Sequence, residues 1–500
     1  MQNAISPFTA FELRRLKKRR HVERERSDMH DYQHMGSLFA YTNPFCALFI
    51  DLGLGKTIIS LTTAIDLWME GKVDKILVIA PLKVANQTWP TEIKLWGHTC
   101  FMRHSMITGS LPQRMKGLRS DAPIHIVNRE NTEWLVNHFK RDWPYDMVII
   151  DESSAFKDHK TRRFKALKNV RPFIKRMIQL TASPVAESLE HLFAQIYLLD
   201  QGERFGKSIT KYRDTYFNFN RWSMKYKIAP GQEDVIVEKI SDISLEMRAK
   251  DYLDMKEPQL IERSVILGED QLALYKRMSK DFMVEIIDEL GDSTVIEAET
   301  AASLAGKLLQ MASGVIYESR KELVPGTDQV KKVITHHPLH EHKLDELENL
   351  RDELEGETLL VCYWFKSSLN RLQKRFPTAV TLDREGSQVD AWNKGKIKMM
   401  FLHPASGGHG LNLQKGGHNI VFYDLPSSYE LWQQVIGRLN RQGQKMLVRI
   451  WVLLARKTDD EKALQRLKDK GDAQDYFYDK LKRYHAKVKR ALLRKLEGAA

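Results

Sequence analysis

Two sets of short apolar runs alternate with segments of helical spacing along this chain, and a long charged stretch separates the two sets. Short apolar runs bounded by turn residues are typical of buried strands, and their alternation with helices indicates a parallel sheet covered on both faces. The sequence therefore predicts an α/β protein with two similar lobes. The strands expected in the first lobe are 46–50, 75–80, 123–127, 146–150 and 176–180, and those in the second are 358–364, 396–402, 418–423 and 448–453.

The stretch between the two sets is predicted to be mainly helical. Apolar residues recur at helical spacing over 270–290 and 297–311, whereas 226–231 has the composition of a loop or hairpin. Another helix is expected over 343–354, leading into the second sheet. The last residues, 456–500, also read as helical, and their apolar stripe predicts a packing face more than a partner site.

A phosphate-binding loop is predicted directly after the first strand. The stretch Gly53-Leu54-Gly55-Lys56-Thr57 lies between an apolar run and a segment of helical spacing. A glycine turn that opens a helix presents backbone N–H groups to phosphates, while the lysine adds a cation and the threonine hydroxyl can hold Mg²⁺. The general pattern has Gly where this chain has Ile50, so the loop alone is weak evidence for a nucleotide site.

The strand 146–150 ends in two adjacent carboxylates, Asp151 and Glu152. After a phosphate loop, such a pair has a specific use: Asp151 can hold Mg²⁺, and Glu152 can activate the water that attacks the γ-phosphate. The alternative is a solvated strand end. Lys56, which follows an earlier strand of the same lobe, favours the catalytic interpretation over a solvated strand end.

Hydroxyl groups and arginines complete the candidate chemistry. Thr181 and Ser183 follow another strand, where they could relay the state of the γ-phosphate. Arg438 and Arg441 are three residues apart, and on a helix this spacing would aim both at one point. A pair of arginine fingers for phosphoryl transfer requires that arrangement, and closure of the two lobes to bring them to the nucleotide.

Charge gathers at the two ends of the chain. The net charge is +13, of which residues 1–26 carry +5 and residues 480–500 carry +7. These ends are either solvated or lie on a phosphate backbone. An aromatic and basic stretch, 216–226, could stack on bases, but its aromatic residues are more simply explained as packing between helices.

The remaining composition is that of an ordinary globular protein, with 42% hydrophobic and 29% charged residues over 500 positions. No apolar run is long enough to span a membrane, and the first residues do not resemble a signal peptide. Three cysteines in or beside apolar runs, without metal spacing, predict buried thiols in a reducing compartment, the cytoplasm.

In this motif order the chain resembles the superfamily-two helicase-type motors, specifically the Swi/Snf-type DNA-dependent ATPases, and most of all their compact bacteriophage and prophage members. The resemblance covers the chain from Tyr32 to about Lys457. The stretches similar to family motifs are Tyr32-Gln33, 51–57, Ala80-Pro81-Leu82 with Trp89 and Trp96, Asp151-Glu152, 180–184, 407–413 and 434–444.

This resemblance implies two RecA-like parallel-sheet lobes with helical insertions between them, and ATP with Mg²⁺ bound between the lobes. Thr57 and Asp151 are then the metal-binding residues. The implied partner is double-stranded DNA, gripped through its backbone without sequence preference. The implied catalytic residues are Lys56, Asp151, Glu152, Arg438 and Arg441, and the implied nucleotide contacts are Gln33 on adenine together with Gly53, Gly55, Lys56, Thr57, Gly410 and Gln434.

Five segments follow from the pattern and the resemblance together. A basic arm precedes the first lobe, and a basic helical extension follows the second. The predicted boundaries are 1–28 for the arm, 29–200 for the ATP-binding lobe, 201–335 for the inter-lobe insertions, 336–457 for the second lobe and 458–500 for the extension.

Some positions depart from the family pattern. Ser153-Ser154 stands where many relatives have a small residue and His, Ala182 replaces a glycine, and Asn440 replaces a histidine. These changes leave the hydrolytic groups in place but bear on how tightly hydrolysis depends on DNA. The predicted function is ATP-driven translocation on duplex DNA. The alternatives are a strand-separating helicase and a nucleotide-switched protein that grips DNA or remodels a partner with slow turnover.

Overall fold

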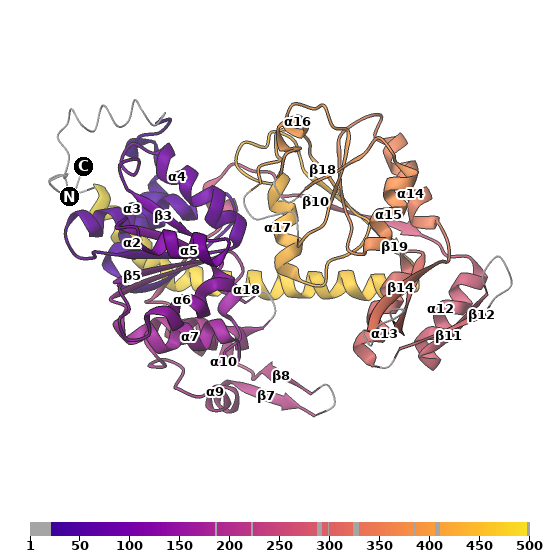
Figure 1. The fold of residues 1–500 in the computed structure, drawn as a ribbon, viewed down its shortest axis with the longest axis horizontal. Coiled ribbons are helices and arrows are strands. Elements are labelled where there is room, and N and C mark those ends of the chain that lie inside the picture. Colours follow the sequence, from indigo (N-terminus) through magenta and orange to yellow (C-terminus); the bar gives the residue numbers. More distant parts are fainter. Residues whose placement is uncertain are drawn as a thin grey trace. The chain divides into compact units, whose positions relative to one another are not determined.

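The computed structural model describes residues 22–497, except 186–187, 222–223, 288–292, 299, 324–329, 384–385 and 406–410. Its chain divides into two compact units (Figure 1): one contains residues up to Asp254 together with those from Gly471 onward, and the other is Met255–Lys470. Gly410, predicted to contact the nucleotide, lies outside the described residues, as does the basic arm before residue 22. Within the described ranges, no helix has the length and apolar character needed to cross a membrane.

A parallel seven-stranded sheet forms the centre of the first unit, in the order β3-β4-β2-β5-β6-β1-β9. All five strands expected from the sequence are present, and the polar strands β3 and β9 are additional. Their bounds are β1 Phe45–Ile50, β2 Ile76–Ala80, β3 His104–Ile107, β4 Ile124–Asn128, β5 Met147–Asp151, β6 Arg176–Thr181 and β9 Ser244–Met247.

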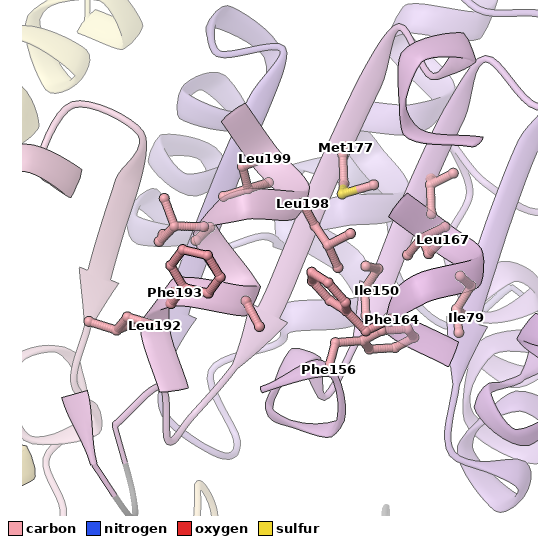
Figure 2. Packing of buried hydrophobic residues seen from close by; sticks show 14 of the residues in the cluster. Ile79, Ile150, Phe156, Phe164, Leu167, Met177, Leu192, Phe193, Leu198 and Leu199 are labelled. Atoms are coloured by element: carbon pink, nitrogen blue, oxygen red, sulfur yellow. The ribbon is translucent and has the colours of Figure 1, made fainter. Parts of the chain in front are cut away.

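Alternate residues of each strand enter two separate apolar cores, one on each face of the sheet. Phe49 and Ile150 face one core, whereas Leu48 and Ile149 face the other. Figure 2 shows part of the first core, in which Phe164 and Leu167 of a helix lie close to Ile150 and Ile79 of the sheet. Burying one such side chain contributes about 1.5–3 kcal/mol.

Helices supply the other half of each core. Those packing on the Leu48 face are α2 (Asp31–Thr42), α3 (Lys56–Met69) and α4 (Trp89–Leu95); those on the Phe49 face are α6 (Thr132–Phe139), α7 (Arg162–Val170), α8 (Leu192–Asp200), α9 (Ile209–Tyr216) and α10 (Gln232–Ile240).

The second unit contains a parallel six-stranded sheet in the order β10-β19-β18-β15-β17-β16. Four strands were expected, and β10 and β16 are additional. The helix α14 (His342–Glu353) packs on this sheet through Leu344, Leu347 and Leu350, as the sequence predicts. The strand bounds are β10 Gln259–Val265, β15 Leu359–Cys362, β16 Val380–Thr381, β17 Met399–Leu402, β18 Asn419–Phe422 and β19 Arg449–Ala455.

The stretch between the expected lobes holds the predicted helices and, in addition, antiparallel hairpins. The helix predicted over 270–290 is too long: α12 (Glu269–Asp281) ends before β11 (Met283–Ile287), which pairs with β12 (Ser293–Glu297). The helix predicted over 297–311 is α13 (Ala301–Ala312), followed by the hairpin of β13 (Val315–Leu323) and β14 (Val330–Pro338). The hairpin considered near 226–231 is also formed, by β7 (Phe217–Asn220) and β8 (Lys225–Ile228).

The chain ends in one long helix, α18 (Asp459–Glu497), drawn in yellow in Figure 1. Its residues from Gly471 onward belong to the first unit. Phe477 and Leu481 are fully buried in the Phe49 core, and Leu492 is buried in the opposite core. The predicted packing face is therefore confirmed, and this end of the chain is part of the first unit's interior.

Candidate nucleotide site

The loop between β1 and α3 has the backbone that a phosphate cradle needs. Gly53 and Gly55 adopt φ angles of 89° and 80°, in the left-handed region that favours glycine. The helix α3 begins at Lys56, so its free N–H groups face the loop. Ile50, which departs from the general motif, is the fully buried last residue of β1. The Lys56 ammonium donates to the carbonyl oxygen of Ile50 at 3.0 Å.

Gln33, to which the resemblance assigns recognition of adenine, lies against this loop. Its Nε2 donates to the carbonyl oxygen of Leu54 at 3.2 Å, and its Oε1 accepts from the backbone N–H of His30 at 3.0 Å. A Cβ atom at Gly55 would come within 2.4 Å of Gln33 Nε2. The φ angle therefore favours glycine at 55, and a side chain there would also require Gln33 to move.

The two carboxylates lie at the same edge of the sheet as the loop. Asp151 ends β5, the next strand β6 separates β5 from β1, and parallel strands end at one edge. Asp151 is buried and accepts a hydrogen bond from Trp89 Nε1 at 2.9 Å. Glu152 follows with a φ angle of 57°, a conformation uncommon outside glycine and often found at functional sites.

Burial, reinforced by the neighbouring Glu152, raises the pKa of Asp151 to about 6. The Trp89 hydrogen bond and the Lys56 ammonium act in the opposite direction. Burial also raises the pKa of Asp51, the residue after β1, although the N–H of Ala249 donates to its Oδ2 at 2.9 Å. Both carboxylates lie in a poorly solvated site that would be stabilised by a cation.

Thr181 and Ser183 form a turn at the end of β6, between the loop and the carboxylates. The N–H of Ser183 donates to Thr181 Oγ1 at 3.1 Å. Ser153, one of the departures from the family pattern, donates through its hydroxyl to Gln195 Oε1 at 3.1 Å, so it is a fixed structural group. Sequence reasoning did not identify Gln195, because its helix carries no motif.

The two arginines of the second unit do not lie on one helix, although their spacing predicts that they do. The helix α17 (Tyr429–Leu439) includes Gln434 and Arg438, but it ends before Arg441. The argument from helical spacing is therefore wrong for Arg441, because Asn440 leaves the helical conformation. Arg438 is 9% exposed and donates to the carbonyl oxygen of Leu411 at 3.4 Å, whereas Arg441 donates to Asn412 Oδ1.

Gln434, which the resemblance places at the nucleotide, is buried on α17. Its Nε2 donates to Glu430 Oε1 at 3.4 Å. Gln444, at the end of the same motif, donates to the carbonyl oxygens of Gln414 and Gly417 at 3.1 and 2.9 Å. These bonds hold the segment after α17 to residues 414–417.

The basic C-terminal end is less free than its charge indicates. Lys480 pairs with Asp234 at 2.6 Å, Lys482 pairs with Asp251, and Lys489 pairs with the fully buried Glu246. These three cations are partly neutralised within the first unit. This end of the chain is therefore a packed helix, and its contact with a phosphate backbone stays a prediction.

The aromatic and basic stretch has a packing role for several of its rings. Tyr216 and Phe217 are buried in the Phe49 core, and Tyr226 packs against that core. Phe219, at 44% exposure, is only partly covered. The packing interpretation is thus confirmed for three of the rings, while Trp222 lies outside the described residues.

The fold and the site define a P-loop nucleotide hydrolase with two parallel-sheet units of the helicase type. Residues 30–236 match the SNF2-related domain family. The chain is 33% identical over 455 residues to "Putative protein p41" of Acyrthosiphon pisum secondary endosymbiont phage 1, covering 86% of this chain and 94% of that protein. It therefore belongs to the Swi/Snf-type helicase-like ATPases, the DNA-dependent ATPases of superfamily two, and it is an ATP-dependent motor protein.

More distant relatives cover similar shares of the chain. The "Uncharacterized ATP-dependent helicase YqhH" of Bacillus subtilis (strain 168) is 21% identical, covering 84% of this chain and 74% of that protein. Among solved structures, the "Sulfolobus solfataricus SWI2/SNF2 ATPase core in complex with dsDNA" aligns with a TM-score of 0.42 and 21% identity, covering 90% of this chain and 92% of that one.

Proposed function

We propose that this chain hydrolyses ATP in order to translocate along double-stranded DNA. The observation that carries the proposal is the shared sheet edge in the first unit. One edge holds a glycine cradle with Lys56, a buried carboxylate in Asp151 and a strained Glu152. The family to which the chain belongs hydrolyses ATP, and this edge contains the groups that ATP hydrolysis requires.

The residues divide the work of hydrolysis. Backbone N–H groups of the cradle and the Lys56 ammonium bind the β- and γ-phosphates, which requires Lys56 to exchange its bond to the Ile50 carbonyl. Glu152 accepts a proton from the attacking water. Arg438 and Arg441 stabilise the charge that develops on the γ-phosphoryl group. Gln33 recognises the adenine ring, and Gln434 and Gly410 contribute further contacts to the nucleotide.

The donor set of this edge fits Mg²⁺. Oxygen ligands are what this ion prefers, and Thr57 in the first turn of α3 and Asp151 at the end of β5 offer a hydroxyl and a carboxylate. The raised pKa of Asp151 agrees with a cation site, because a cation would stabilise its ionised form. When bound, Mg²⁺ neutralises phosphate charge, and Thr57 and Asp151 hold and orient it.

We place part of the DNA contact on the hairpin of β7 and β8. Opposite residues of antiparallel strands share a face, and the register pairs Asn218 with Lys227 and Asn220 with Lys225. The opposite face carries the rings that pack on the core. The outer face is therefore basic and polar, and no ion pair engages either lysine within the described part of the chain. Such a face binds backbone phosphates without reading sequence.

The thiols of Cys46, Cys100 and Cys362 are buried and form no disulfide bond within the described part of the chain, which fits a reducing compartment, and we propose that the protein acts in the cytoplasm of its cell.

The test is the rate of ATP hydrolysis with no nucleic acid, duplex DNA, single-stranded DNA or RNA. We expect stimulation by duplex DNA, and a loss of roughly a hundredfold or more in Lys56→Ala and Glu152→Gln with DNA binding retained. The surface substitution Glu203→Gln serves as the control and should behave as the unmodified protein. Normal turnover in Glu152→Gln would refute the site.

The choice of nucleic acid decides among the alternatives. Stimulation mainly by single strands, with displacement of a strand from a forked substrate, would favour a helicase. A rate indifferent to all nucleic acids, with a stable protein complex, would favour the nucleotide switch. Displacement of a third strand from a DNA triplex, which requires movement along the duplex, would support translocation directly.

A further inference from the structure

The carbonyl oxygen of Ala182 lies between the two hydroxyl residues of the turn after β6, and α18 holds it from the other side. Tyr478 donates its hydroxyl hydrogen to this oxygen at 2.8 Å, and Gln474 Nε2 donates to the same atom at 3.3 Å. Tyr478 and Gln474 are 1% and 6% exposed. Two buried donors from a distant part of the chain thus meet on one peptide group of the candidate site.

The Tyr478 ring is held in place on several sides. It belongs to the Phe49 core, together with its neighbour Phe477, whose ring centre lies 6.2 Å from that of Phe49. The Arg248 guanidinium lies 5.2 Å from the centre of the Tyr478 ring and pairs with Asp475 of the same helix. The position of the hydroxyl group is therefore set by packing and not only by its hydrogen bond.

The same part of α18 is linked to the beginning of the phosphate loop. Arg248, paired with the helix, directly precedes Ala249, whose N–H donates to the carboxylate of Asp51 at 2.9 Å. Asp51 is the residue after β1, where the loop begins. One helical segment therefore contacts the turn at the end of β6 and, through Arg248 and Ala249, the end of β1.

We propose that Tyr478, assisted by Gln474, is a positioning residue for ATP hydrolysis. By fixing the Ala182 peptide it sets the orientation of the adjacent Thr181 and Ser183 hydroxyls relative to the γ-phosphate. Tyr478 does not touch the nucleotide. This inference rests on the proposed hydrolytic site and adds to it a residue that no sequence motif contains.

The test uses Tyr478→Phe in the full-length protein, because this change removes one oxygen and keeps the buried ring. Tyr484→Phe is the matched control, as Tyr484 lies on the same helix and is 38% exposed. For Tyr478→Phe we expect kcat for ATP in saturating duplex DNA to fall about threefold to tenfold, the range that loss of one well-placed hydrogen bond gives. The KM for ATP should stay within about twofold, as expected for a group that acts on the transition state.

Thermal unfolding separates positioning from simple support of the fold. A positioning role predicts a lowered kcat at an unchanged unfolding temperature, and the same direction of change in Gln474→Ala. A normal kcat in both variants, or a loss of activity that only follows a lowered unfolding temperature, would overturn the inference. Lys56→Ala is measured alongside: if it remains active, the proposed site itself fails, whereas an inactive Lys56→Ala with a normal Tyr478→Phe rejects only the role of Tyr478.

Discussion

The carboxylates of the first unit and the arginines of the second differ in how they are held. Asp151 and Glu152 lie at the end of a buried strand, with Trp89 donating to Asp151 at 2.9 Å. Arg438 and Arg441 instead donate to groups of their own unit, the Leu411 carbonyl and the Asn412 side chain. Under the proposed mechanism, the carboxylates are already held by their own strand, whereas the arginines must exchange hydrogen-bond partners to act on the nucleotide.

This difference has a physical reason. A carboxylate that binds a cation or activates water needs a fixed geometry and little solvent, and the end of a buried strand provides both. An arginine that acts on the transition state should contribute little to binding of the ground state, because uniform binding does not accelerate the reaction. Arg438 and Arg441 donate to Leu411 and Asn412, and the proposed mechanism requires the γ-phosphate to compete for these donors.

The largest expected effect tests this difference directly. Arg438→Ala should lower kcat for ATP roughly a thousandfold, as removal of an arginine finger does, while the dissociation constant of a non-hydrolysable ATP analogue changes little. Steady-state hydrolysis and equilibrium binding give the two values. Arg466→Ala, an exposed arginine of the same unit, is the control. If analogue binding weakens as much as kcat falls, Arg438 is a ground-state ligand and the contrast between the two units is lost.

A smaller effect concerns the cost of keeping Asp151 buried. Its pKa of about 6 lies above the ordinary 3.8, so the folded protein holds this proton more tightly than the unfolded chain. Stability should therefore fall as pH rises from about 4 to about 6, and the penalty is complete above pH 6. Asp151→Asn removes the charge and keeps an acceptor for Trp89. It should be inactive yet more stable above pH 6, by up to about 3 kcal/mol.

Denaturant unfolding at pH 7.5 and at pH 4, without nucleotide or divalent cations, measures this effect. The stability difference should vanish at the lower pH, where Asp151 is protonated in the folded protein. An equally large gain at pH 4 would show that a cause other than charge burial is responsible. No gain at pH 7.5 would mean that Asp151 is already well stabilised, like the arginines of the second unit.

The sheet strands and the glycine loop of the first unit could be predicted because they depend on local patterns. Continuous apolar runs identified β1, β2, β4, β5 and β6, and a glycine turn between strand and helix identified the phosphate loop. The polar strand β9 was missed because its place beside β1 is set by tertiary packing. The helix expected over 270–290 continued too far, because Phe282 adopts a left-handed conformation that no residue pattern signals.

The supporting residues of the site could not be predicted for a related reason. Gln195, Gln474 and Tyr478 are distant in sequence from Ser153 and Ala182, to which their side chains are hydrogen-bonded. Spacing also misplaced Arg441, because three residues from Arg438 implies a shared face only while the helix continues. Periodicity predicts which residues lie on the same helix or strand. Which other parts of the chain that helix or strand contacts can be read only from the fold.

The smallest expected effect concerns DNA binding by exposed lysines. Some of these lysines have an ion-pair partner and others have none among the described residues. Lys225 and Lys227 are exposed on the outer face of the β7–β8 hairpin. Lys72 and Lys175 are also exposed but pair with Glu70 and Asp146, both at 2.7 Å. Replacing Lys225 and Lys227 by alanine therefore removes two positive charges that have no ion-pair partner in the described part of the chain. Replacing Lys72 and Lys175 by alanine removes two positive charges that are already paired.

Changing Lys225 and Lys227 together should weaken duplex binding about fivefold and reduce the slope of log affinity against log salt by about 2, because two phosphate contacts are lost. Changing Lys72 and Lys175 should leave that slope nearly unchanged. Fluorescence anisotropy with a labelled duplex over a salt series measures both. Deleting residues 480–500 is a poorer test of charge, since it would also remove the buried Leu481 and Leu492. Equal slopes for the two double variants would show that DNA responds to overall charge, and that the hairpin is not a contact.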